Sequence, residues 1–188
     1  MAVYYDISGN VTYPIDLDAA KRQLRIDPII TYDDTRITEI IAEATEIASD
    51  YTGRRYVEQD IVIEAPAFIT DIEAVFSPIT SISAITYLDV DGNEQSLVAD
   101  TDFKLYNTDP YTRELVYIID PLPELYSEQT ERLVKITGKV GYTATTLPKG
   151  ARSGIMLLIS YLYENRNDSV DERVRASQTI LRRHKQWA

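Results

Sequence analysis

The chain of 188 residues contains no cysteine, one histidine and seven glycines, and each shortage excludes a class of chemistry. Without cysteine there is no disulfide, no thiolate zinc site and no cysteine nucleophile. A metal site made of several histidines is excluded because His184 is the single histidine. The few glycines form no phosphate-binding loop, since Gly138 and Gly141 fall in a strand-and-turn context. We therefore predict no enzyme activity, no cofactor and no bound metal.

A long apolar run is also missing. No segment approaches the roughly 18 apolar residues that span a bilayer, and residues 1–10 lack the basic and apolar regions of a signal peptide. We expect a soluble protein made without a signal peptide. Hydrophobic residues make up 44% of the chain and charged residues 26%, which is typical of one folding unit and argues against disorder.

The formal net charge of −11 is unevenly distributed. Residues 149–188 contain eight Lys or Arg and four Asp or Glu, a net of +4, so residues 1–148 carry −15. An acidic body repels nucleic acid, whereas a short basic end suits an acidic partner. The alternative is that the basic side chains only cap a terminal helix.

The charges around His184 argue against a catalytic role for it. It lies between Arg183 and Lys185, next to Arg182, and this positive charge lowers its pKa instead of preparing it as a base. We expect a solvated residue of the terminal helix.

Helical periodicity marks four segments, and short β-rich runs separated by Pro, Gly, Asn and Asp lie between the second and the third. The predicted helices are residues 15–25, 34–51, 148–165 and 170–185. The predicted strands are residues 57–64, 79–89, 95–98, 103–106, 115–119 and 133–140. This order predicts an α+β fold, in which a four-helix core of two N-terminal and two C-terminal helices carries an inserted antiparallel β-sheet subdomain.

The predicted organisation has three segments in one folding unit. Residues 1–54 form an N-terminal lead and the first two core helices, 55–147 the β-rich insertion, and 148–188 the C-terminal core helices and basic tail. Both ends of the insertion join the same core, so we expect Tyr56 and Tyr142 to lie close together.

One acidic loop resembles a calcium-binding loop. Asp89, Asp91, Asn93 and Asp100 match positions of such a loop, but Gly92 does not fall where the sharp turn requires glycine. Asp91-Gly92 between two strand-like runs is instead a strong signal for a β-hairpin, which we predict here.

Tyrosine dominates the aromatic residues, with 14 Tyr against three Phe and one Trp. Tyrosine is enriched at wet protein interfaces, which would indicate assembly. It is also enriched in β-strands because of its β propensity, which would indicate no function. Tyr4, Tyr5 and Tyr13 lie in an N-terminal segment without clear core periodicity, and we predict that they make contacts between subunits.

Three local patterns together resemble the head-tail connector (adaptor, or head-completion) proteins of tailed bacteriophages, in the branch with a β-rich insertion in a helical core. Residues 17–27 (LDAAKRQLRID) look like the first helix of that family. Residues 40–54, which end in YTGR, look like its second helix. Residues 139–166, with KVGY, LP and YENR, look like its third helix and the strand before it. The chain departs from the family in a longer, more acidic N-terminal lead and an unusually basic end.

The resemblance implies a structural protein of the virion neck, made in the host cytoplasm and without an active site. It implies a ring of twelve subunits beneath the portal protein that extends the DNA channel and gives the tail its attachment site. Genomic DNA passes through such a channel without sequence-specific binding, and an acidic wall lets it slide. The family's C-terminal segment faces the capsid, so Arg182, Arg183, Lys185 and Trp187 are expected to dock on the portal.

Two other functions stay open at this point. A ligand- or carbohydrate-binding β module would explain the tyrosines and requires a concave aromatic pocket in the sheet. A carboxylate-dependent hydrolase would explain the many Asp and Glu residues and requires a close carboxylate pair in a cleft.

Overall fold

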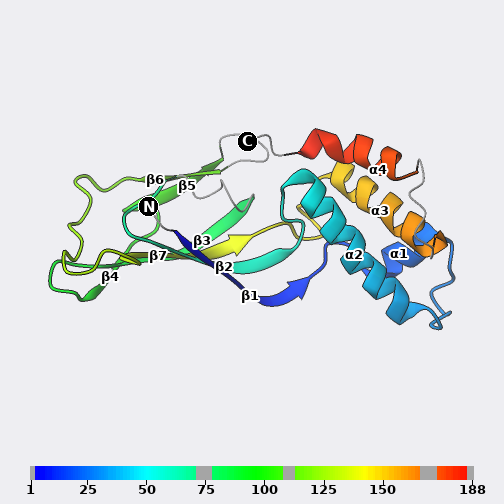
Figure 1. Cartoon of the computed structure of the whole chain (residues 1–188), viewed down its shortest axis with the longest axis horizontal. Coiled ribbons are helices and arrows are strands. Elements are labelled where there is room, and N and C mark those ends of the chain that lie inside the picture. Colours follow the sequence, from blue (N-terminus) through cyan, green and yellow to red (C-terminus); the bar gives the residue numbers. More distant parts are fainter. Residues whose placement is uncertain (1–2, 71–77, 108–112, 166–172, 186–188) are drawn as a thin grey trace. The chain divides into compact units, whose positions relative to one another are not determined.

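The computed structural model describes residues 3–70, 78–107, 113–165 and 173–185, and its contacts divide the chain into two compact units (Figure 1). The β unit comprises Met1–Val11 and Gln59–Gly141, and the helical unit comprises Thr12–Glu58 and Tyr142–Ala188. Within the described ranges the fold is α+β, with four α-helices and an antiparallel sheet, as the sequence predicts.

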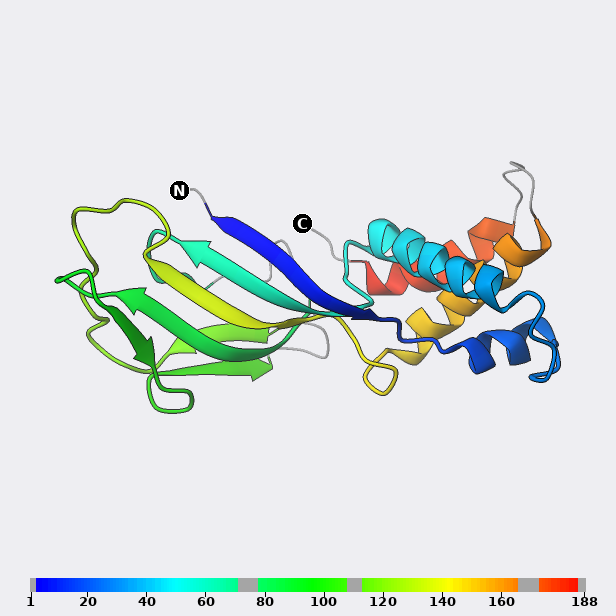
Figure 2. The same ribbon diagram turned by 90° about the horizontal axis from the view of Figure 1, so that it is seen from below.

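The β unit contains a five-stranded sheet in the order β1-β2-β7-β3-β4 and a separate hairpin, β5-β6. Its strands are β1 (Tyr4–Thr12), β2 (Glu58–Ala65), β3 (Ile79–Leu88), β4 (Glu94–Leu97), β5 (Phe103–Asn107), β6 (Arg113–Tyr117) and β7 (Val134–Val140). Alternate residues of β2, such as Ile61 and Ile63, are buried, and Phe103 and Leu115 of the hairpin share their core. The hairpin therefore covers one face of the sheet (Figure 2).

Gly138 of β7 is required by an irregularity in its partner strand. The pairing of β3 with β7 shifts register between Ile79 and Ser81 and again between Ile82 and Ala84. This irregularity brings the Ser81 carbonyl so close that a Cβ at position 138 would lie 2.3 Å from its oxygen. Only glycine fits without a backbone movement.

The helical unit contains α1 (Leu17–Leu24), α2 (Asp34–Thr52), α3 (Lys149–Glu164), α4 (Arg173–Leu181) and the short 3-10 helix η1 (Arg182–His184). The Asp16 side chain caps α1 by accepting the Ala19 amide at 2.6 Å. Gly53 ends α2 in the left-handed conformation, which glycine adopts without strain. The helices bury one core, which includes Ile37, Ile41, Ile155 and Leu181.

Two glycines of α3 allow the C-terminal helices to pack closely. A Cβ at Gly154 would lie 2.7 Å from the Leu181 Cγ, and a Cβ at Gly150 would lie 2.5 Å from the His184 Nε2. Residues four apart lie on one face of a helix, so the two glycines form a single groove that receives Leu181 and His184.

The two ends of the β-rich segment meet, as predicted. The rings of Tyr56 and Tyr142 stack with centroids 5.8 Å apart, and both side chains are buried in the helical core. Apart from β1, the described strands agree with the predicted ranges to within two residues, and so do the first three helices. The fourth helix, α4, ends at Leu181 instead of Lys185 and is followed by η1, and residues 170–172 of the predicted helix lie outside the described ranges.

The N-terminal segment requires a correction. Residues 1–54 were predicted to form a lead and two helices without a strand, but Tyr4–Thr12 forms β1 at the edge of the sheet. The hydrogen bonds of β1 with β2, which is distant in sequence, stabilise this strand although its own sequence has no strand periodicity. In the part of the chain that the structure describes, no helix has the length and apolar character needed to cross a membrane.

Candidate assembly surfaces

Tyr4 is the centre of a polar surface at the edge of the β unit. The Arg132 guanidinium lies 4.3 Å from the Tyr4 ring centre, and the Tyr4 hydroxyl donates to Glu131 Oε2 at 2.9 Å. That hydrogen bond and the negative charge of Glu131 raise the pKa of Tyr4. Arg132 also forms an ion pair with Glu64 at 3.3 Å.

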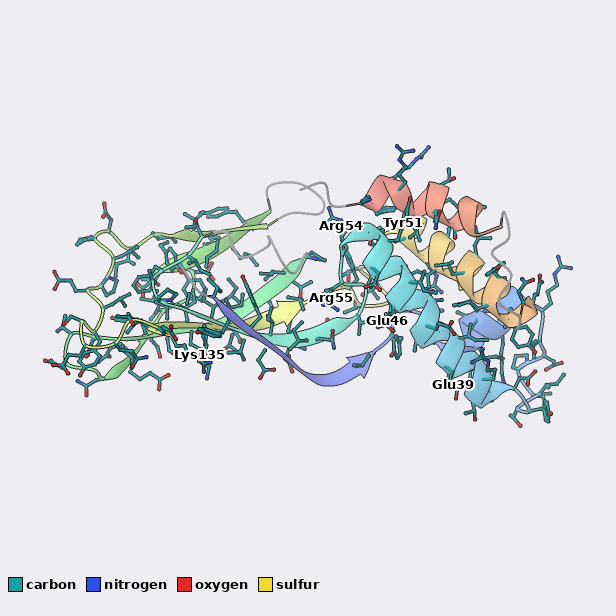
Figure 3. All side chains as sticks on the ribbon, in the orientation of Figure 1. Glu39, Glu46, Tyr51, Arg54, Arg55 and Lys135 are labelled. Atoms are coloured by element: carbon teal, nitrogen blue, oxygen red, sulfur yellow. The ribbon has the colours of Figure 1, made fainter. Side chains whose placement is uncertain are left out.

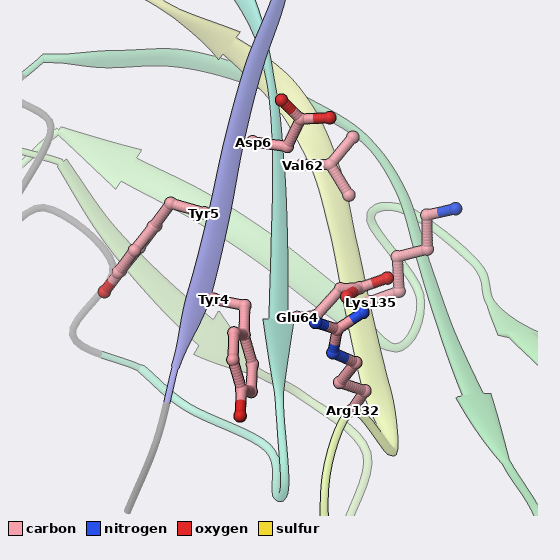
Figure 4. Close-up of a pocket in the computed structure, with 7 residues that line it drawn as sticks. All are labelled: Tyr4, Tyr5, Asp6, Val62, Glu64, Arg132 and Lys135. Carbon is pink, nitrogen blue, oxygen red and sulfur yellow. Dashed lines mark ion pairs between the residues drawn. The ribbon is translucent and has the colours of Figure 1, made fainter.

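These side chains border a depression of about 410 Å³ (Figure 4). It is lined by Tyr4, Tyr5, Asp6, Val62, Glu64, Arg132 and Lys135. Its two cations are matched by two carboxylates, so the depression suits polar contacts and favours neither an acidic nor a basic ligand.

The structure does not bring the three predicted contact tyrosines together. Tyr5 lies on the side of β1 opposite Asp6 (Figure 4) and packs against the core of the β unit. Tyr13 belongs to the helical unit and packs against its core. Tyr4 is held by exposed polar side chains, and the role of all three tyrosines between subunits stays a prediction.

The predicted basic docking residues lie at and just after η1. Arg182 and Arg183 are exposed, while Lys185 is half-buried with its Nζ 5.7 Å from the Tyr51 ring centre. Trp187 lies outside the described residues. The Arg54 Nε donates to the His184 carbonyl at 2.7 Å, which holds η1 at the C-terminal end of α2, where Figure 3 labels Tyr51 and Arg54.

The expectation of a solvated His184 is wrong, because its side chain is only 8% exposed. Burial, followed by the positive charges of Arg54 and Arg183, lowers its pKa. The sequence predicted this direction from the neighbouring charges and missed the larger effect of burial. Gly150 is the reason for the burial, since its missing side chain makes room for the imidazole.

The exposed face of α2 is acidic. Glu39, Glu43, Glu46 and Asp50 are all exposed, and their spacing of four, three and four residues places them along one side of the helix. Figure 3 labels Glu39 and Glu46 on this side. The acidic character deduced from composition thus has a defined location in the helical unit.

The acidic loop after β3 is a hairpin turn, as predicted. Asp89 Oδ1 accepts the amides of Asp91 and Asn93 at 3.0 and 2.9 Å, and Gly92 adopts a positive φ of 77°. A hydrogen bond from the Gln95 side chain, followed by those from the Asn93 and Asp91 amides, lowers the pKa of Asp89. The carboxylate therefore shapes the turn that joins β3 to β4.

Aromatic residues of the β unit contribute to its own core. The Phe68 ring lies 5.6 Å from the Tyr87 ring and 5.3 Å from the Tyr117 ring. Burial raises the pKa of Tyr117 well above its ordinary range. Tyr87 and Tyr117 therefore pack in the core of the β unit and do not form an open face to which a sugar could bind.

The loop between α1 and α2, residues 25–33, is an exposed apolar surface that was not predicted from the sequence. Ile29 is 86% exposed, Ile30 53% and Tyr32 92%. Beneath them Lys21 is 2% exposed and donates to the carbonyls of Ile30 and Pro28. A sequence signal was present, because Lys21 occupies an apolar-face position four residues after Leu17 and three before Leu24.

Comparison with known proteins gives matches in structure only. A scan against models of protein families finds no match, and a search of curated proteins finds none. The fold matches a chain in a structure of the neck of an empty gene transfer agent (GTA) particle computed with C6 symmetry, with a TM-score of 0.73 and 17% identity over 98% of this chain and 96% of that one.

A chain in the virion of a native gene transfer agent particle matches with a TM-score of 0.72 and 16% identity, again over 98% of this chain and 96% of the other. A chain in the neck of a native GTA particle computed with C12 symmetry matches with a TM-score of 0.63 and 18% identity over 95% of both. At these identities the matches show a shared fold. Because they extend over nearly the whole of both chains, the β unit and the helical unit are shared together.

Proposed function

We propose that this chain is a non-enzymatic structural protein of the neck of a tailed bacteriophage or a phage-like particle, where it acts as a head-tail connector (adaptor). The observation that carries the proposal is the fold shared with neck chains over 98% of this chain and 96% of the other. The connector-like sequence patterns of residues 17–27, 40–54 and 139–166 support it independently of the fold.

The proposed working form is a ring of twelve subunits beneath the portal. The matched neck structures were computed with C6 and C12 symmetry, and a twelve-fold ring is compatible with both. The resemblance to connectors supports the same number. Tyr4, with Arg132 and Glu131 around it, is the best placed of the predicted tyrosines for a contact between subunits.

We further propose that the four helices form one core into which the β-rich segment is inserted. In support, the helical unit is built from two segments, Thr12–Glu58 and Tyr142–Ala188, on either side of the strands β2 to β7. In this proposal residues 1–54 and 148–188 form the core and residues 55–147 are the insertion. The exception is β1, which lies in the first segment but joins the sheet.

Portal docking is assigned to Arg182, Arg183, Lys185 and Trp187. The exposure of the two arginines supports this, because a guanidinium makes paired hydrogen bonds with a carboxylate of a partner. The acidic side of α2 supports passage of DNA through the ring, since like charge on a channel wall prevents tight binding of phosphates.

Imaging of purified particles tests the proposal. The chain is first identified in the particles by mass spectrometry, and their necks are then reconstructed by electron cryo-microscopy. We expect twelve copies in a ring between the portal and the tail. Absence of the chain from particles, or a location in the capsid shell, would contradict the proposed function.

A further inference from the structure

Two buried side chains hold the basic end of the helical unit, and two exposed arginines lie between them in the sequence. Leu181 is 1% exposed and His184 8%, whereas Arg182 and Arg183 are exposed. The Arg54 Nε donates to the His184 carbonyl at 2.7 Å, which ties η1 to the end of α2. The backbone that carries the two arginines is therefore ordered before a partner binds, and a preordered surface loses little conformational entropy on binding.

Two further exposed cations come from distant parts of the sequence. Arg55 directly follows Arg54 (Figure 3), and Lys149 directly precedes Gly150, against which the His184 imidazole packs. Each of these two contacts of His184 thus has an exposed basic neighbour in the chain. We call the four exposed cations the basic cluster: Arg55, Lys149, Arg182 and Arg183.

Few carboxylates accompany the basic cluster. Residues 142–163 and 173–188 contain seven Lys or Arg and no Asp or Glu, and residues 50–58 contain Asp50 and Glu58. Glu58 is half-buried, so Asp50 is the exposed acidic residue among the described side chains of these three segments. Four exposed cations against one exposed carboxylate favour an acidic partner.

The surroundings of the basic cluster favour an acidic protein surface over nucleic acid. The acidic side of α2 extends from Glu39 to Asp50, close to the end of the helix to which η1 is tied. At the start of α3, the Arg152 guanidinium donates to the Pro14 carbonyl at 3.4 Å, two residues before the exposed Asp16. Duplex DNA carries one phosphate charge per about 1.7 Å of its axis, so a duplex over the cluster would also meet these carboxylates. An acidic protein surface of limited size can match the cluster and avoid them.

We propose that the basic cluster is a single docking surface for a carboxylate-rich protein surface, which under the proposed function belongs to the portal. The docking site is thereby extended from the C-terminal residues to Arg55 and Lys149, which lie in other parts of the chain. Each arginine can form paired hydrogen bonds with one carboxylate, and Lys149 adds a point charge. The identity of the partner rests on the proposed function, whereas its acidic character follows from the basic cluster.

Retention of the chain on heads tests the docking surface. In a strain that produces particles, the gene for this chain is deleted and a parent or variant copy is supplied. Mass spectrometry of purified heads then gives the ratio of this chain to the portal protein. Arg55→Glu/Lys149→Glu should lower this ratio at least about fivefold, because repulsion replaces attraction at two contacts.

Arg22→Glu/Arg25→Glu is the matched control for this variant. It makes the same change of net charge at two exposed positions near the start of α2, where Lys21 pairs with Asp34, and should leave the ratio unchanged. Both double variants should melt like the parent protein, since all four residues are exposed. If the first variant melts at a lower temperature, Arg55→Gln/Lys149→Gln replaces it and should lower the ratio at least about twofold.

The remaining outcomes separate this docking surface from the proposed function. Absence of the parent chain from heads contradicts the proposed function itself. If the parent chain is present and Arg55→Glu/Lys149→Glu is retained equally well, or the control pair is lost to the same extent, the docking surface is wrong and the proposed function stands.

The class of partner is tested by suppressors and by DNA binding. Substitutions that restore retention of Arg55→Glu/Lys149→Glu should replace Asp or Glu residues of the portal. Restoring substitutions at acidic residues of this chain would assign the cluster to contacts between copies and overturn the proposal. Fluorescence anisotropy with a labelled DNA duplex at physiological salt should show equal binding by parent and variant, and tighter binding by the parent would assign the cluster to nucleic acid instead.

Discussion

Replacing Lys21 by methionine removes the buried ammonium while retaining an apolar chain of similar length. Three contacts are lost: the carbonyls of Pro28 and Ile30 lose a charged donor, and the Asp34 carboxylate loses its counter-ion. Removing one partner of a buried ion pair costs about 3–5 kcal/mol. The Asp34 side chain is 27% exposed and can be solvated in part, so we expect a loss of about 2–4 kcal/mol in the free energy of unfolding.

Urea denaturation followed by circular dichroism at 222 nm measures this loss, since the helical unit contains all the described helices. With a slope of about 2 kcal/mol per molar urea, in the middle of the usual range, the midpoint should fall by roughly 1–2 M. Arg22→Met is the matched control, because Arg22 is the exposed neighbour of Lys21 on the same helix, and its effect should stay within about 0.5 kcal/mol.

A double-mutant cycle separates the ion pair from the carbonyl contacts. Asp34→Asn combined with Lys21→Met should be less destabilising than the sum of the single changes, with a coupling of about 1–2 kcal/mol. If Lys21→Met and Arg22→Met shift the midpoint equally, the buried ammonium does not hold the loop between α1 and α2.

Three further predictions address other parts of the chain. Gly138→Ala places a Cβ 2.3 Å from the Ser81 carbonyl oxygen, so we expect unfolding to become easier by about 1–3 kcal/mol, and an unchanged melting temperature would show that β3 adapts. Burial and nearby guanidinium groups lower the folded-state pKa of His184 below 6.5, so the unfolded chain takes up the proton first. Its contribution to stability is complete above about pH 6.5 and falls as the pH decreases below that value, and His184→Gln should flatten this part of the curve of stability against pH; an equal slope in both proteins would contradict the assignment. Arg182→Glu/Arg183→Glu should leave melting unchanged, since both side chains are exposed, and should reduce retention of the chain on portal-bearing heads, whereas unchanged retention would place the portal contact elsewhere.

Much of the fold could be predicted because local sequence and burial agree. The period of Ile37, Ile41 and Ala44 predicts the buried side of α2, and all three are buried. Asp91-Gly92 likewise predicts a turn whose geometry Asp89 then fixes. β1 was not predicted, because Ser8, Gly9 and Asn10 are turn-like residues and an edge strand depends on its neighbour for hydrogen bonds.

The candidate surfaces were harder to predict, because exposure of a side chain is decided by distant parts of the chain. His184 lies in a basic sequence that indicates solvent, yet Gly150, 34 positions earlier, makes a place for it in the core. Tyr5 and Tyr13 have no helical or strand periodicity that shows their burial, and packing against two different cores shows it. Of the predicted docking residues, Arg182 and Arg183 are exposed as expected.

The loop between α1 and α2 shows most clearly why a sequence leaves such a surface unresolved. Ile29, Ile30 and Tyr32 follow Asp27-Pro28 in a short stretch without periodicity, and the same residues would also be compatible with a buried turn. In the structure the loop is exposed and not a buried turn. The Lys21 ammonium donates to two carbonyls of the loop backbone, and the three side chains lie in solvent. A lysine on the apolar side of a short helix is the one sequence signal that such a loop leaves, because its charge must be neutralised by groups that the neighbouring chain brings to it.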